Sequence, residues 1–268
     1  MDTDDALRVM AWFNISTCFP LALVVICCLC YKARRDHVPV YYINLIISDL
    51  IQLSTMIVWV TKKNHDMVQY SCVVVYIFSV MTSLGFRMCI ALERYFVIVC
   101  PQLPCIRQIK GSVWVCVAVW GIFLVTVPLP VYFEQDLFVY TLAILPAPVF
   151  IICLAGTLKS VLQTPPAAAS VPAEEKRRIL GILVLLLLSY ILTILPAAIM
   201  SIIRVTSHYF YYNKIIVMIS FILILLSPFL DLILFVFLYK GPIDKLLMRL
   251  CCCRMQDAAA GDGSTPSV

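Results

Sequence analysis

The sequence predicts an all-α membrane protein, a seven-transmembrane helix bundle with its amino terminus outside the cell. Three observations lead to this prediction: the composition, seven long apolar stretches, and an uneven distribution of basic residues. The 268 residues are 63% hydrophobic and 13% charged, whereas a soluble domain carries about 25% charged residues. A fold in water cannot hide this much apolar surface, so lipid must be the solvent.

Seven stretches are apolar enough to cross about 30 Å of hydrocarbon, which takes about 20 helical residues. Backbone groups have no water to bond inside a bilayer, so each stretch is expected to be a helix. The stretches run over 9–31, 40–61, 70–99, 112–133, 137–162, 179–203 and 214–239. An odd number of spans places the two termini on opposite sides of the membrane.

The basic residues set the orientation. Fourteen of the 20 Lys and Arg side chains lie in one set of connecting segments, five lie in the other, and Arg87 lies inside the third span. Cytoplasmic segments carry the excess of Lys and Arg. The amino terminus is therefore expected outside and the carboxyl terminus in the cytoplasm. The acidic start predicts no cleavable signal peptide, and we expect a multi-pass protein of the plasma membrane.

The chain is expected to divide into a transmembrane domain over 1–242, an amphipathic segment over 243–254 and a disordered tail over 255–268. The amphipathic segment alternates apolar and charged faces at helical spacing, which is typical of a short eighth helix on the inner leaflet. Cys251, Cys252 and Cys253 end it, and juxtamembrane cysteines are candidates for S-palmitoylation. The alternative is that these thiols stay unmodified.

An ordered set of motifs runs through the spans. The second span holds Asn44 and Asp49 in the pattern Asn-Leu-x-x-x-Asp, and the third ends in Glu93-Arg94-Tyr95 with a proline seven residues after the arginine. Further markers follow in the later spans: Trp120, Pro130, Pro196, Ser227 and Asp231. Together they resemble the rhodopsin-like (class A) G-protein-coupled receptors, nearest to the purinergic, proton-sensing and lysolipid group. The resemblance implies a receptor that passes an extracellular signal to a heterotrimeric G-protein.

The sequence also departs from that family's pattern. Cys72 lies about one turn too close to Arg94 for the usual outer disulfide, so no disulfide is expected. Ile194 stands where the family has a tryptophan, and Leu232 and Leu234 replace a proline and a tyrosine. Helix kinks are expected at Pro196 and at Pro228. These losses affect switching by a ligand and not the fold.

Ionisable residues inside spans are costly and are therefore functional candidates. Asp49, Arg87 and Asp231 lie at mid-depth of spans two, three and seven. By resemblance, Asp49, Ser83, Ser227 and Asp231 would line a small sodium pocket. We expect Arg87 to reach Asp49 or Asp231 as a built-in cation that replaces sodium, with no other cofactor. In the alternative, Arg87 extends to the cytoplasmic face or faces a water-filled cleft.

The inner end of the third span carries the motif that the family uses for signalling. By resemblance, Glu93 holds Arg94 at rest and releases it, with Tyr95, toward the G-protein. The family's second restraint is an acid at the inner end of helix six, and Lys176 occupies that position here, followed by Arg177 and Arg178. A basic group repels Arg94, which predicts a weak lock and some basal activity. Alternatively, the three basic residues are plain membrane anchors.

The ligand is left open as a small molecule, a lipid or a proton. His65 and His208 could sense protons, but loop histidines are more often solvated bystanders. Asn14 starts a glycosylation pattern that is expected to be unused inside the first span. The competing function is a non-signalling receptor-like scaffold or dimer partner. A transporter or channel is disfavoured because no repeat is present. No nucleophile–base pair, phosphate loop or metal-ligand spacing indicates an enzyme, and no nucleic-acid partner is expected.

Overall fold

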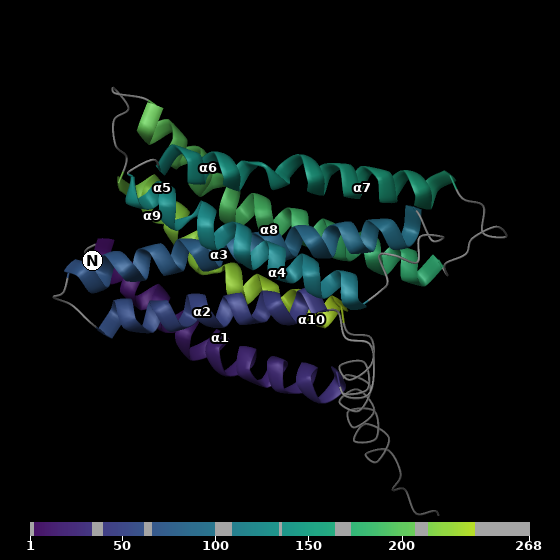
Figure 1. Ribbon diagram of the computed structural model, residues 1–268, viewed down its shortest axis with the longest axis horizontal. Helices are drawn as coiled ribbons and strands as arrows, with labels where there is room; N and C mark the ends of the chain where they lie inside the picture. Colours follow the sequence, from purple (N-terminus) through teal and green to yellow (C-terminus); the bar gives the residue numbers. More distant parts are fainter. Residues whose placement is uncertain are drawn as a thin grey trace, which may run out of the picture.

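The computed structural model describes residues 3–33, 40–61, 66–99, 109–133, 136–163, 173–206 and 214–238. These residues are all-helical apart from single turn residues, and seven spans are long and apolar enough to cross a membrane, as the sequence predicted. Figure 1 shows their axes running side by side along the long dimension of the molecule. The expected eighth helix, Cys251 to Cys253 and the tail lie outside the described residues.

Four spans are single helices and three are divided. The elements are α1 (Thr3–Ala33), α2 (Val40–Thr61), α3 (Asp66–Val99), α4 (Ile109–Thr126), α5 (Pro128–Tyr132), α6 (Asp136–Ile144), α7 (Pro146–Gln163), α8 (Ala173–Thr206), α9 (Lys214–Leu225) and α10 (Ser227–Leu238). We call the end where α3 ends and α8 begins the inner end, and the opposite end the outer end. The sequence analysis expects the inner end to be cytoplasmic.

Prolines account for the divided spans, which the sequence analysis had treated as single helices. The α4–α5 and α6–α7 junctions each lie one residue before a proline, Pro128 and Pro146. The α9–α10 junction lies two residues before Pro228. Proline has no N–H to donate and its ring crowds the preceding turn, so the helix is interrupted there. By contrast, α1 continues through Pro20 and α8 through Pro196.

The bundle is organised around α3. Every residue from Ser79 to Arg87 is buried, so this part of α3 is covered on all sides. It packs most extensively on α2 and next on α7. Gly85 permits a close approach by α4, because a Cβ there would lie 2.6 Å from the Phe123 ring. This stretch of α3 is therefore enclosed by the neighbouring helices.

Polar side chains of neighbouring spans bond to carbonyls at two of the proline breaks. At the α6–α7 break, the Tyr190 hydroxyl donates to Ala143 O at 3.0 Å. At the α9–α10 break, Phe229 N–H donates to Leu226 O at 3.1 Å, one residue later than a regular helix requires. The Asn14 side-chain amide of α1 donates to the Leu225 carbonyl that is passed over. Each break is thus tied to a different helix.

Asn14 should therefore contribute to stability and not carry a glycan. It is 1% exposed and its carboxamide oxygen accepts from the Cys18 thiol at 3.2 Å. We expect Asn14→Ala to lower the free energy of unfolding by about 1–2 kcal/mol, because a carbonyl in an apolar environment loses its donor. Thermal unfolding in detergent measures this.

Ser16→Ala is the matched control for that prediction. It destroys the glycosylation pattern but leaves the Asn14 amide in place, since the exposed Ser16 hydroxyl bonds only to Phe13 O of its own helix. Wild-type stability and surface expression are expected. Equal losses in Asn14→Ala and Ser16→Ala would show that the pattern acts through a glycan and that the amide bond is unimportant.

Candidate functional site

A buried ion pair lies at the centre of the bundle, between Arg87 of α3 and Asp231 of α10. The Arg87 Nε–H lies 2.8 Å from Asp231 Oδ1, and Nη2 lies 2.6 Å from Oδ2. The two side chains are 0% and 1% exposed. This two-pronged geometry matches the planar guanidinium fork to the carboxylate, and it is the strong form of a charge-assisted hydrogen bond. Arg87 therefore faces Asp231 and does not extend to the inner surface.

The ion pair bridges two helices whose backbones barely touch. Direct contacts between α3 and α10 are sparse, whereas α10 packs mainly on α8, α1 and α2. The long side chain of Arg87 spans the intervening distance. Removing the pair would therefore remove the main direct link between α3 and α10, while α10 would keep its packing on α8, α1 and α2.

The break before α10 supplies a further acceptor to the guanidinium. The same Arg87 Nη2 donates to the Ser227 hydroxyl and is 3.5 Å from the Ser227 carbonyl. Ser227 is fully buried and is the first residue of α10. The interruption at Leu226 thus brings a hydroxyl one turn from Asp231 onto the face that meets Arg87.

Asp49 of α2 lies beside the pair but is not bonded to Arg87. Its charged neighbours are Asp231 and Arg87, and its Oδ1 accepts a long 3.5 Å hydrogen bond from Gln52 Nε2. Its Oδ2 has no hydrogen-bond partner among the described residues. The sequence analysis left Asp49 and Asp231 open as partners of Arg87, and the structure pairs Arg87 with Asp231.

Ser83, like Asp49, makes no hydrogen bond to Arg87. It is buried one turn outward from Arg87, but its hydroxyl donates to Val80 O of its own helix at 2.8 Å. It therefore contributes no bond to the ion pair. The sequence correctly placed it on the Arg87 face of α3, but that placement did not determine how its hydroxyl is bonded.

Two tyrosines at the site had not been singled out by the sequence analysis. The Tyr42 hydroxyl of α2 donates to the Asp231 backbone carbonyl at 2.9 Å, and its ring stacks on Phe235 with centroids 5.8 Å apart. The Tyr76 hydroxyl of α3 is buried without a hydrogen-bond partner among the described residues. The available signal was a phenol inside an apolar span, which needs a partner for its polar tip.

The inner end holds Glu93, Arg94 and Tyr95 without the lock that the resemblance implied. Glu93 and Arg94 form no ion pair within the described part of the chain, and Glu93 Oε2 and Arg94 Nε are buried without hydrogen-bond partners there. Lys176 was expected at the inner end of helix six, just before the span predicted over 179–203; α8 begins at Ala173, so Lys176 lies within the helix, and it is 8% exposed. No described carboxylate pairs with it.

Tyr95 is held by a close approach of α3 to α7. A Cβ added at Gly156 would lie 2.5 Å from Tyr95 Cε2 and 3.1 Å from its hydroxyl oxygen. Its ring also packs edge-on against Phe96, with centroids 5.5 Å apart. Glycine at this position of α7 is therefore required by the tyrosine ring, and it fixes where the third residue of the motif lies.

These features can be compared with known proteins. The family model described as "7 transmembrane receptor (rhodopsin family)" matches residues 22–139. Over this segment the chain is similar to the rhodopsin-like receptors. The matched segment includes Asp49, Arg87 and Glu93-Arg94-Tyr95, whereas Asp231 lies beyond it. No curated protein matches the chain.

Of the other residues that the sequence analysis named, only some lie within the described part of the chain. Cys72 is a free, partly buried thiol, and Pro101, His65 and His208 lie outside the described residues. Within the described ranges, no group of three or more His, Cys, Asp and Glu side chains has an arrangement that could hold a metal ion. The candidate site therefore consists of the Arg87–Asp231 ion pair and of Glu93, Arg94 and Tyr95 at the inner end.

The buried ion pair leads to a prediction about the free energy of unfolding. Arg87→Leu should lower the unfolding free energy by about 3–5 kcal/mol and reduce surface expression, because Asp231 is left buried without its counter-ion. Asp231→Asn should cost less, since an amide oxygen still accepts from the guanidinium. The double variant Arg87→Leu, Asp231→Leu should recover part of the loss, because no unpaired charge remains. Thermal unfolding of wild type, Arg87→Leu, Asp231→Leu and the double variant gives the coupling, and strictly additive losses would contradict it.

Gly156→Ala should displace the Tyr95 ring and lower the unfolding temperature. Gly181→Ala in α8 is its matched control, because a Cβ there meets nothing within 4 Å. Both changes gain the same helix propensity, up to about 1 kcal/mol. The difference between the two unfolding temperatures therefore reports the Tyr95 contact alone. If Gly156→Ala is as stable as Gly181→Ala, α7 and Tyr95 are not in the close contact described.

Proposed function

We propose that this receptor couples to a heterotrimeric G-protein at its inner end through Glu93, Arg94 and Tyr95, at the plasma membrane. Similarity to the rhodopsin family over residues 22–139 supports the general activity, and the state of Arg94 supports the particular mechanism. A buried guanidinium nitrogen without a partner is held less firmly than a paired one. Arg94 is thus available to an acceptor group that a partner protein inserts between α3, α7 and α8.

Basal activity follows from the same observation. The restraint that the resemblance implied from Glu93 is absent, and the inner end of α8 offers the buried cation Lys176 in place of an acid. Like charges at close range disfavour each other, so Lys176 opposes a resting position of Arg94 near α8. We propose that Arg177, which is exposed, and Arg178 take part in the same contact with the G-protein.

We further propose that the Arg87 guanidinium takes the place that sodium holds in the family. It occupies the space between Asp231 and Ser227 and supplies a positive charge on a covalent tether. A tethered cation cannot be washed out by a change in salt. This part of the receptor should therefore hold α3 and α10 together at any sodium concentration.

A second candidate function is a non-signalling partner that binds or tunes other receptors. The permanence of the Arg87–Asp231 pair favours it, because an internal bond that no ion can leave resists rearrangement. The hydrophobic residues Ile194, Leu232 and Leu234, at positions where the family carries switch residues, favour it too. In either case, we propose that palmitoylated Cys251, Cys252 and Cys253 attach the tail to membrane lipids.

The experiment is ligand-free activation of each G-protein class in cells, at matched surface expression. Wild type should activate at least one class. Arg94→Ala should lower that activity about tenfold or more, which corresponds to a coupling free energy of about 1–3 kcal/mol. Lys159→Ala is the control, since it removes an exposed basic charge from α7 near the same end. Silence of the wild type in every class at good surface expression would contradict the coupling mechanism and favour the non-signalling partner.

A further inference from the structure

The eight cysteines within the described residues fall into two groups. Five are buried or partly buried among the helices, namely Cys18, Cys72, Cys89, Cys116 and Cys153. The other three are exposed, and they lie within four residues of α1: Cys27, Cys28 and Cys30. Cysteine is among the residue types that are most often buried, so three exposed thiols in one turn of one helix are unusual.

The three thiols lie on the outward side of α1. Leu29 is 1% exposed and marks the side that faces the neighbouring helices. At about 100° per residue, Cys28 and Cys30 flank Leu29 and Cys27 lies nearly opposite it. α1 packs on α2, α9 and α10, and Figure 1 shows its second half along the edge of the bundle. The cysteine thiols are therefore directed toward the surrounding lipid.

The end of the apolar span sets the depth of these thiols. The span of α1 ends at Cys30, and Lys32 follows two residues later. At 1.5 Å per residue, the three cysteines lie about 3–7.5 Å from the level of Lys32 along the helix axis. Arg34 and Arg35 continue the basic run in the sequence. Since basic residues flank spans on the cytoplasmic side, the thiols belong at the boundary of the inner leaflet.

An exposed apolar stripe leads from the thiols toward the middle of the membrane. Leu23 and Val24 lie four and three residues before Cys27, a spacing that places all three side chains on one face. Leu23 is 43% exposed and Val24 is 59% exposed. Leu21, seven residues before Cys28, is 50% exposed. A hydrocarbon chain attached to Cys27 or Cys28 would lie along these side chains, parallel to the neighbouring lipid.

We propose that Cys27, Cys28 and Cys30 form an S-acylation site, which takes a long-chain fatty acyl group from an acyl-coenzyme A thioester. A cysteine thiolate attacks the thioester carbonyl and forms a new carbon–sulfur bond. The bond to the coenzyme A sulfur breaks, and coenzyme A leaves as a thiol with the proton that the cysteine lost. Cysteines beside a membrane span are candidates for this reversible modification.

The site is separate from the cysteines of the tail and from the residues proposed for G-protein coupling. It requires only that the inner end of α1 faces the cytoplasm, as the distribution of basic residues predicts. The competing explanation is that each exposed cysteine serves as a small apolar group in contact with lipid. An acyl thioester and a free thiol are chemically distinct, so a direct count of thioesters separates the two explanations.

The test counts acylated thiols on the full chain expressed in cells. Free thiols are blocked with N-ethylmaleimide, thioesters are cleaved with hydroxylamine, and each newly freed thiol is coupled to a maleimide polymer that shifts the protein on a gel. Cys251, Cys252 and Cys253 are replaced by serine in every protein compared, so that any shift arises elsewhere. This background should still shift after hydroxylamine. The combined change Cys27→Ala, Cys28→Ala and Cys30→Ala should abolish the shift.

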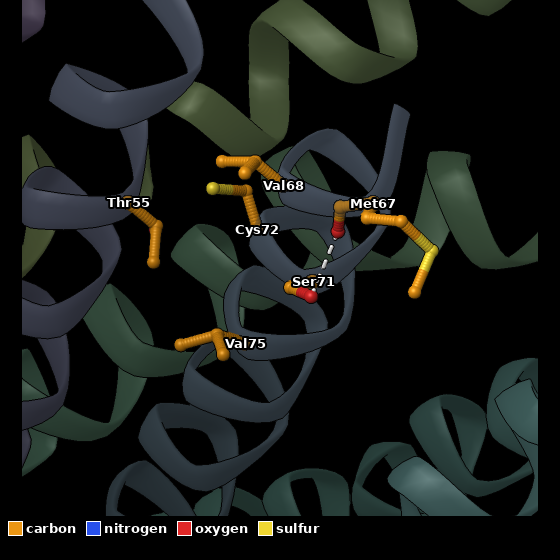
Figure 2. Close-up of a pocket in the computed structure, with 6 residues that line it drawn as sticks. All are labelled: Thr55, Met67, Val68, Ser71, Cys72 and Val75. Carbon is orange, nitrogen blue, oxygen red and sulfur yellow. Dashed lines mark hydrogen bonds between the residues drawn. The ribbon is translucent and has the colours of Figure 1, made fainter. Parts of the chain in front are cut away.

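Cys72→Ala is the matched control. Cys72 lies at the outer end of α3, where it lines a pocket of about 300 Å³ on the side that faces Thr55 of α2 (Figure 2). A thiol at that end is out of reach of a cytoplasmic acyl donor, so the shift should remain. Because the three α1 cysteines are exposed, their replacement should leave the unfolding temperature at the value of the background.

Absence of a hydroxylamine-dependent shift in the background would overturn the proposal and leave the three thiols as apolar groups facing lipid. A shift that survives the triple α1 change, or one that Cys72→Ala also abolishes, would overturn it as well. In the unaltered wild-type chain, mass spectrometry should find the hydroxylamine-dependent label on the peptide that holds residues 27–30. This second readout does not depend on the tail replacements, and neither readout bears on the Arg94 experiment.

Discussion

The buried pair of Arg87 and Asp231 is the interaction on which the arrangement of the bundle depends. Neither charge could stay in the apolar interior by itself, because an isolated ionised group there costs several kcal/mol even after relaxation. Together they form a two-pronged contact that also uses the hydroxyl of Ser227. Since α3 and α10 share few other contacts, this contact is the main direct link between the seventh span and α3.

The need to pair polar groups inside an apolar environment also explains why the proline breaks are tolerated. A membrane-spanning backbone must satisfy its own polar groups, and an interruption exposes carbonyls that need donors. Tyr190 and Asn14 provide donors at two breaks, and each comes from a different span. The break before α10 also presents Ser227 to Arg87. Local irregularity is therefore used to connect helices, and it shapes the site as well as the fold.

The sequence was sufficient for the seven spans, because apolar length alone distinguishes a membrane helix from a connecting segment. It was not sufficient for their interruptions. Pro20 and Pro196 lie inside continuous helices, whereas Pro128, Pro146 and Pro228 lie at breaks. The five residues look alike in the sequence. At Pro146 and Pro228 a neighbouring helix donates to a carbonyl at the break, and such a contact between distant segments cannot be read from the sequence.

The site was predictable to a similar degree. An arginine in the middle of a span predicts an acidic partner, but helical spacing left Asp49 and Asp231 equally acceptable, because the choice depends on how α2 and α10 are rotated. Spacing also placed Ser83 on the Arg87 face without revealing its bond to Val80. The roles of Asn14 and Tyr42 depend on contacts between distant segments, which a single sequence does not contain.

The dependence of stability on sodium tests the central claim most directly. Unfolding temperatures of the purified wild-type receptor would be measured in sodium chloride and in the chloride of a large organic cation at equal ionic strength. If Arg87 serves as the internal cation, the two temperatures of the wild type will agree, and the Arg87→Leu variant, which keeps Asp231, will be stabilised selectively by sodium. A wild-type receptor that is selectively stabilised by sodium would contradict the account, because the site between α2, α3 and α10 would then still accept a free ion.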